Sequence, residues 1–186
     1  MGPIDELKKE HQAVLTGLRI LEEATAKIGG ALTADRVTDI EQLIGFFKVF
    51  VDQCHHGKEE KLLFPALEQI GVSREGGPIG VMLAEHDLGR LNISDMQAAL
   101  GKIKSGDNRA GDVLNESAAA YVELLRRHIE KEDNVLFQIA AAQLSDEELV
   151  RLKIDFEHLE KEEIGSRRHE GYYAILDRLQ EKYLKQ

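Results

Sequence analysis

Apolar residues recur at steps of three and four along most of the chain, which is the pattern of amphipathic helices. Glycine and proline interrupt the pattern and divide it into long segments. It predicts four long helices, over residues 4–28, 35–69, 79–104 and 112–142. Strand signals are missing from the sequence, so we expect an all-α fold. Because short connections favour antiparallel neighbours, the expected architecture is an up-down-up-down four-helix bundle.

A further helical segment is predicted after these four helices. Ser145 and Glu148 have the spacing of a capping box, and the apolar pattern continues from there to Leu184, with a break near Gly165. We therefore divide the chain into a bundle domain at residues 1–144 and a C-terminal extension at residues 145–186. The extension is amphipathic, and it either packs across the bundle or forms a contact in a homodimer.

Histidines interrupt the apolar seams of the first and third helices. His11 follows Leu7 in the first helix, and His86 follows Met82 at the same seam position in the third helix. Both histidines would lie in the core of the bundle. Either one alone could be a buried histidine that is satisfied by hydrogen bonds. Because the two histidines occupy the same seam position in their helices, we expect them to have a common role.

The chain also resembles itself over longer stretches. Glu10-His11 matches Glu85-His86, and residues 55–64 match residues 128–137 in their His, Lys, Glu, Leu and Phe positions. Each half of the bundle therefore carries one histidine followed by one His-x-x-x-Glu motif. This arrangement is typical of a site with approximate twofold symmetry.

The motif spacing predicts a metal centre. Residues four apart lie on one face of a helix, about 6 Å apart along its axis, and both motifs continue apolar stripes that face the core. Burying these imidazoles and carboxylates without a cation would cost several kcal/mol per group, roughly. Together they suit iron, manganese or zinc. A buried polar network is the alternative. The predicted ligands of a two-metal centre are His11, His55, Glu59, His86, His128 and Glu132.

The His-x-x-x-Glu spacing occurs four times in the sequence, so not every instance is a metal motif. The pairs His56/Glu60 and His158/Glu162 follow charged residues one turn earlier, and we assign both pairs to solvated helix faces. His169 is assigned to packing in the core or in an interface.

The amino-acid composition excludes some classes of binding partner. The formal charge of -10 repels phosphate backbones and anionic lipid headgroups, so neither nucleic acid nor a membrane is an expected partner. Cys54 is the single cysteine, which excludes an intramolecular disulfide and favours a role as a small core residue. The sequence has no run of about 18 apolar residues and no signal-peptide pattern, and we expect a cytoplasmic location.

The order His, His-x-x-x-Glu, His, His-x-x-x-Glu, with Leu63-Phe64-Pro65 after the second element, resembles the hemerythrin-like family of cation-binding domains. The resemblance covers residues 1 to about 144. It implies a four-helix bundle with a non-haem di-iron centre, held by the six predicted ligands and closed by an oxo or hydroxo bridge. In that pattern Glu59 and Glu132 would bridge the irons. Zinc or manganese would accept the same ligands.

The sequence departs from the oxygen-carrying members of that family at one ligand. Those proteins have a fifth histidine four residues along the third helix, where this chain has Arg90. About two of roughly twelve coordination positions would then stay open, unless His56, Tyr121 or a residue of the fifth helix closes one. An additional exchangeable position favours chemistry with oxygen, peroxide or nitric oxide, or metal exchange.

The resemblance leads to two functional hypotheses. The first is a di-iron protein that binds or reacts with oxygen, peroxide or nitric oxide, as a carrier or as an enzyme. The second is iron homeostasis, by sensing, storing or donating iron, including iron-sulfur centre repair. Glu10 and Glu85 resemble an acidic residue near the site in the repair branch of the family, or they orient an imidazole N–H. A third hypothesis, from the residues alone, is a structural bundle with packed histidines.

Overall fold

Most of the chain is helical, as the apolar pattern predicts. The structure, a computed structural model, describes residues 1–26, 32–107, 109–163 and 165–185. Helix α1 spans Pro3–Thr25, α4 spans Pro78–Lys104 and α5 spans Ala110–Lys131. The predicted end of the first helix at residue 28 and the side chain of His169 lie outside the described part of the chain.

The second predicted helix is a continuous helical rod of four segments. They are α2 (Ala34–Phe46), η1 (Phe47–His56), η2 (Glu59–Leu63) and α3 (Phe64–Gln69). Helix α5 likewise continues through η3 (Glu132–Leu136) into α6 (Phe137–Gln143). The η segments are π-helical, so each N–H bonds to the carbonyl five residues earlier and each turn holds an additional residue. A pattern with 3.6 residues per turn does not predict this change of register.

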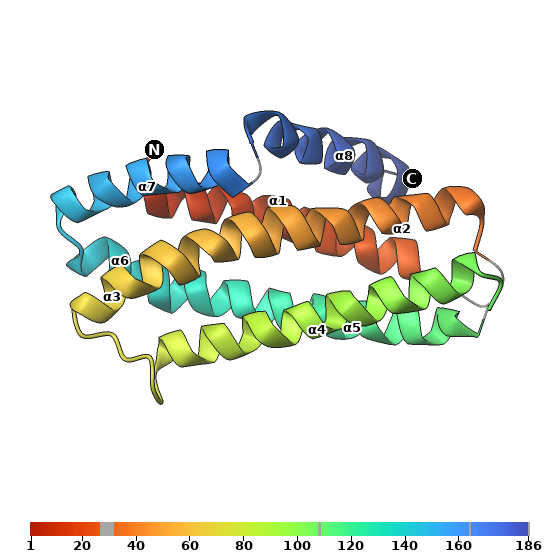
Figure 1. Cartoon of the computed structure of the whole chain (residues 1–186), viewed down its shortest axis with the longest axis horizontal. Coiled ribbons are helices and arrows are strands. Elements are labelled where there is room, and N and C mark those ends of the chain that lie inside the picture. The colour runs from red at the N-terminus through yellow and green to blue at the C-terminus, as the bar shows by residue number, and fades with distance from the viewer. Residues whose placement is uncertain (27–31, 108, 164, 186) are drawn as a thin grey trace.

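Four long helical segments lie side by side along the longest axis of the molecule (Figure 1). They are α1, the rod from α2 to α3, α4, and the rod from α5 to α6. Successive segments run in opposite directions, so the bundle has the predicted up-down-up-down topology. Helix α1 packs against α2 and α5, and α4 packs against η1 and α5.

The C-terminal extension lies along one side of this bundle. Helix α7 (Asp146–Glu163) packs on α1, η1 and η2, and α8 (Ser166–Leu184) packs on α1 and α2 (Figure 1). The capping box before α7 is confirmed, because Ser145 N donates to Glu148 Oε2 at 2.8 Å and Glu148 N donates to Ser145 Oγ at 3.3 Å. The break between the two helices contains Gly165, whose φ of 74° favours glycine.

The apolar core forms two clusters among the described residues. One cluster lies around Leu18, Phe46 and Phe47 and includes residues of α8, and the other lies around Leu7, Phe64 and Phe137 and includes residues of α7. Along the helices, the predicted metal ligands lie at or next to the places where residues of one cluster are followed by residues of the other. No helix in the described ranges has both the length and the apolar character that crossing a membrane requires.

Candidate metal centre

The six predicted ligands meet in the middle of the bundle, and each is at most 1% exposed. The side chains come from six helical elements, so the centre depends on the assembled tertiary fold. The residues and their elements are His11 on α1, His55 on η1, Glu59 on η2, His86 on α4, His128 on α5 and Glu132 on η3.

The donor atoms gather into two overlapping groups within the described residues. In each group, one donor atom from every residue lies within 4.8 Å of the others. Glu59 belongs to both groups, so the two groups adjoin one another. The first group contains His11, His55, Glu59 and Glu132, and the second contains His56, Glu59, His86 and His128.

Each buried carboxylate lies between two imidazole rings from different helices. Glu132 Oε2 is 3.3 Å from Nε2 of His11 and 3.3 Å from Nε2 of His128. Glu59 places Oε1 3.5 Å from His55 Nε2 and Oε2 3.5 Å from His86 Nε2. Each glutamate therefore connects an imidazole of one donor group with an imidazole of the other.

The other ring nitrogen of each predicted histidine ligand contacts a second carboxylate. Because an ionised carboxylate only accepts hydrogen bonds, each Nδ1 carries a proton, and each Nε2 faces the centre, where the Nε2 atoms of His86 and His128 lie 3.1 Å apart. The Nδ1 to carboxylate oxygen distances are 2.9 Å for His11 and Asp133, 2.8 Å for His55 and Glu10, 2.7 Å for His86 and Glu60, and 3.0 Å for His128 and Glu85.

These outer carboxylates follow the internal repeat. Glu10 matches Glu85, and Glu60 matches Asp133, in the alignment of the two halves. Glu10 and Glu85 do orient imidazoles, but each acts on the histidine of the following helix and not on its own neighbour in sequence. The pairing crosses from one helix to another, so the sequence could not assign it.

The inner carboxylates have no hydrogen-bond partner among the described residues. Both oxygens of Glu59, both oxygens of Glu132 and Nε2 of His11 are buried without one. Leaving such groups unsatisfied costs several kcal/mol, roughly, unless a cation binds them. The donor set therefore fits divalent cations that accept nitrogen and oxygen ligands, such as iron.

Protons compete with metal ions for the donor atoms of these side chains. Burial and the neighbouring charge of Glu132 raise the pKa of Glu59 well above its ordinary value. Burial alone would raise the pKa of Glu132, but His128 and His11 hold it well below its ordinary value. Burial alone would lower the pKa of His128, yet Glu132 and Glu85 raise it to about 9. Metal ions therefore compete with protons for Glu59 and for His128.

The assignment of His56 to a solvated face is wrong. His56 is 3% exposed, and its ring stacks on that of His86 with 3.8 Å between centroids and 13° between planes. His55 and His56 are both buried in the π-helical segment η1, where the register of the side chains departs from that of an α-helix. The available sequence signal was the His-His pair, which has Ile129 at the matching place in the second half.

Glu60 is also partly buried and contributes to the centre through His86. Arg90, at the place of the absent fifth histidine, binds carboxylates outside the set of predicted ligands. Its Nε donates to Asp52 Oδ1 at 2.7 Å and its Nη2 donates to Glu60 Oε1 at 2.6 Å. Arg90 thus holds the carboxylate that orients His86, while the hydrogen bond from His86 lowers the pKa of Glu60 despite its burial.

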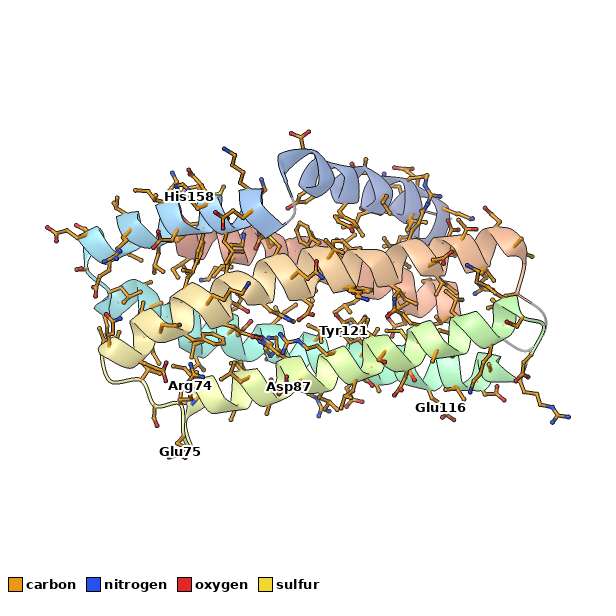
Figure 2. All side chains as sticks on the ribbon, viewed as in Figure 1. Arg74, Glu75, Asp87, Glu116, Tyr121 and His158 are labelled. Atoms are coloured by element: carbon orange, nitrogen blue, oxygen red, sulfur yellow. The ribbon has the colours of Figure 1, made fainter. Side chains whose placement is uncertain are left out.

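A pocket of about 230 Å³ leads from the surface to His56 and His86. Arg90 and Asp52 line it, together with Tyr121, which lies inside the bundle near α4 (Figure 2). Burial raises the pKa of Tyr121, so its phenol stays protonated at neutral pH. The volume accommodates several water molecules at about 30 Å³ each, which suits a small ligand.

The remaining candidates lie outside the centre. Cys54 is buried, and burial raises the pKa of its thiol to about 12, which agrees with a role as a core residue. His158 is exposed on the outer side of α7 (Figure 2), as predicted for a solvated face. Neither donor group contains a described residue of α7 or α8.

The chain is similar in sequence to several known proteins. Uncharacterized protein Rv1995 of Mycobacterium tuberculosis and Uncharacterized protein Mb2018 of Mycobacterium bovis are each 25% identical to the chain over 177 residues, which cover 94% of this chain. The chain spans 66% of the length of these relatives. Iron-sulfur cluster repair protein YtfE of Dickeya chrysanthemi is 31% identical over 85 residues, 45% of this chain and 38% of that protein.

A protein-family model identifies the family of this chain. The model of the hemerythrin HHE cation binding domain matches residues 2–140, which span the four long helical segments and all six predicted ligands. This match confirms the resemblance that the order and spacing of histidines and glutamates indicate. The chain belongs to the hemerythrin HHE cation-binding domain family.

Proposed function

We propose that this chain is a non-haem di-iron protein that binds or reacts with oxygen, peroxide or nitric oxide. The observation that carries the proposal is the position of Glu59 and Glu132, each between imidazole nitrogens of two donor groups. A carboxylate in that position can bridge two cations. The two irons would be held by His11, His55, Glu59, His86, His128 and Glu132.

The donor chemistry favours iron over the other candidate metals. Imidazole and carboxylate donors without a thiolate suit iron, and inward-facing glutamates and histidines in the core of a four-helix bundle are typical of di-iron carboxylate proteins. When bound, iron supplies reversible one-electron changes and an affinity for diatomic ligands and peroxide. The chain itself orients each imidazole through the outer carboxylates.

Purified protein reconstituted anaerobically with ferrous iron provides the test. We expect about two tightly bound irons per chain, followed by a change in the ultraviolet-visible spectrum on adding oxygen, peroxide or nitric oxide. The double variant His55→Ala/His128→Ala should lose the iron, whereas His158→Ala, which alters an exposed His-x-x-x-Glu motif, should keep it. A wild-type chain that binds zinc but not iron would contradict the proposal.

The response of the oxidised protein to peroxide distinguishes an oxygen carrier from an enzyme. Rapid evolution of oxygen gas indicates catalase-like turnover. A stable absorption band that appears on oxygenation and disappears on deoxygenation indicates carriage.

A second candidate function is iron donation, including the repair of iron-sulfur centres. The similarity of 85 residues to Iron-sulfur cluster repair protein YtfE favours it. Iron that moves from this chain to an apo iron-sulfur acceptor, faster than from an equal concentration of ferrous citrate, would support donation. Iron that resists strong chelators would count against it.

A further inference from the structure

His56 is a buried imidazole that makes no hydrogen bond in the structure. Neither of its ring nitrogens has a hydrogen-bond partner among the described residues, although the residue is only 3% exposed. Asp52 Oδ1 lies 3.6 Å from its Nδ1, which is too long for a hydrogen bond. Burying two unsatisfied ring nitrogens is costly unless another partner binds them.

The position of the ring indicates what that partner is. A ring nitrogen of His56 lies within 4.8 Å of donor atoms of Glu59, His86 and His128. The rings of His56 and His128 meet edge to face, with centroids 5.7 Å apart. His56 thus adds an imidazole to the donor group that contains His86, whereas the group that contains His11 and His55 gains none.

The two halves of the internal repeat differ at this residue. Ile129 occupies the position that matches His56, and it packs in the apolar cluster around Leu18. A packing role alone would be met by an apolar residue in both halves. The imidazole therefore makes the centre asymmetric, with two histidines in one donor group and three in the other.

We propose that His56 is a fifth imidazole ligand of the di-iron centre, which binds the iron held by His86 and His128. This inference rests on the proposed function, because it assumes that two irons occupy the donor groups. It assigns to η1 the ligand that Arg90 cannot supply from α4. About one coordination position then stays open, on the side of His11 and His55, in place of about two.

The pocket beside His56 predicts a second effect of removing the His56 ring. His56 and His86 both line this pocket, so the pocket reaches the donor group that contains His86 and His128. Removal of the ring should open a coordination position and also connect it to the surface. Small anions such as azide should then reach the centre more rapidly.

Anaerobic titration of the metal-free chain with ferrous iron tests the ligand role. In His56→Ala we expect the second equivalent of iron to bind at least about tenfold more weakly than in wild type, since even outer partners of metal ligands contribute about 10–100-fold to affinity. His158→Ala is the matched control and should bind like wild type. His56→Phe keeps a ring against His86 without a donor nitrogen, and it should show the same loss if His56→Ala folds poorly.

Two further readouts separate this inference from the proposed function. The Mössbauer spectrum of wild type should show two inequivalent irons, and His56→Ala should alter only one of them. Azide should bind faster to oxidised His56→Ala than to His158→Ala. If His56→Ala and His56→Phe bind both irons as tightly as His158→Ala, the fifth-ligand assignment is wrong while the proposed function stands. If wild type itself does not bind two irons, the proposed function fails and the inference falls with it.

Discussion

Lys58 and Lys131 occupy equivalent positions in the two halves of the repeat, but their surroundings differ. Lys58 is fully buried beside Glu10, Glu6 and Glu160, and its ammonium lies 5.7 Å from the ring centroid of Phe156 on α7. Burial alone would lower the pKa of Lys58, but Glu10 and the other neighbouring negative groups raise it, so the charge is retained. Glu10, Cys54 and Glu160 form a further cluster of possible metal donors. The ammonium of Lys58 compensates the negative charge of its two carboxylates, so this cluster does not require a metal.

The burial of one lysine and the exposure of the other predict unequal effects of the same substitution. Lys58→Met should lower the free energy of unfolding by about 3–5 kcal/mol, because it removes the cation from a buried ion pair. Lys131→Met should cost only about 0–1 kcal/mol, because the Lys131 side chain is 42% exposed beside Glu85. Urea denaturation of both variants in the same metal state measures the difference. Equal losses would show that α7 does not seal the Lys58 site in solution.

Gly17 decides how closely α1 approaches the rod of α2 and η1. A Cβ at this position would lie 2.9 Å from Cε1 of the buried Phe46 ring and 3.3 Å from Cζ of Phe47. Gly17→Ala should therefore destabilise the protein by roughly 1–3 kcal/mol through overpacking, in spite of the better helix propensity of alanine.

Gly101 on α4 provides the control for this substitution. A Cβ there meets nothing within 4 Å in the described structure. Gly101→Ala should therefore stabilise the protein by about 0.5–1 kcal/mol, because it only reduces the backbone entropy lost on folding. Thermal melting of the two variants gives the comparison, and a stabilising Gly17→Ala would mean that the helices pack less closely than described.

At the scale of elements, the π-helical segments contribute most to the site. Segment η1 ends at His56, directly after the predicted ligand His55, and η2 and η3 begin at the predicted ligands Glu59 and Glu132. π turns are rare and are often found at functional sites. Here their additional residue per turn brings successive histidines of one rod into two different donor groups.

Helix α8 is attached to α2 through one buried carboxylate. Asp39 is 1% exposed and accepts hydrogen bonds from Lys182, from Arg178 Nη1 at 3.1 Å and from Tyr183 Oη at 2.9 Å. Burial alone would raise the pKa of Asp39, but these three donors hold it below its ordinary value. The stabilisation is therefore complete above the ordinary aspartate pKa of about 3.9 and is lost as the pH falls through the lowered pKa.

This attachment predicts an acid-sensitive helix. Below about pH 4, amide hydrogen exchange in residues 172–184 should lose protection before exchange in α4 does. Asp39→Asn should reduce the protection of α8 at neutral pH by about 1.5–3 kcal/mol, because it removes the charge from these hydrogen bonds. The variant should also lose the pH dependence of this protection below about pH 4. Unchanged exchange in Asp39→Asn would show that apolar packing alone holds α8.

At the scale of the whole molecule, a polar layer separates two apolar clusters. The seven histidine and glutamate side chains of the two donor groups occupy this layer, and described residues of every long helical segment contribute to it. Such a layer is stable when its charges are compensated and unfavourable when they are not. Metal content and folding stability should therefore be linked.

Removal of iron should accordingly lower the melting temperature. Stabilisation by a bound ligand grows with the logarithm of its free concentration, and it reaches about 2.7 kcal/mol at one hundred times the dissociation constant. Thermal melts at a series of buffered ferrous concentrations should show this rise for wild type and none for His55→Ala/His128→Ala. A melting temperature that is independent of iron in wild type would contradict the link between the metal and the fold.

The sequence by itself determined the features that depend on local spacing. The apolar periodicity predicted the long helices, Ser145 and Glu148 predicted the start of α7, and self-comparison identified six side chains that do meet in the core. These predictions succeed because a helix brings residues three or four apart onto one face, and because a duplicated pattern places equivalent residues at equivalent depth.

Only the tertiary structure decided the features that depend on helical register and on contacts between distant segments. The π turns of η1 bury His56, which a wheel of 3.6 residues per turn places on a solvated face. Glu10 orients His55, from which it is separated by 45 residues, and α7 buries Lys58. A π turn holds an additional residue, so it rotates every later side chain of the helix relative to an α-helical register. Hydrogen-bond partners on different helices depend on how the helices pack and not on the spacing of the residues in sequence.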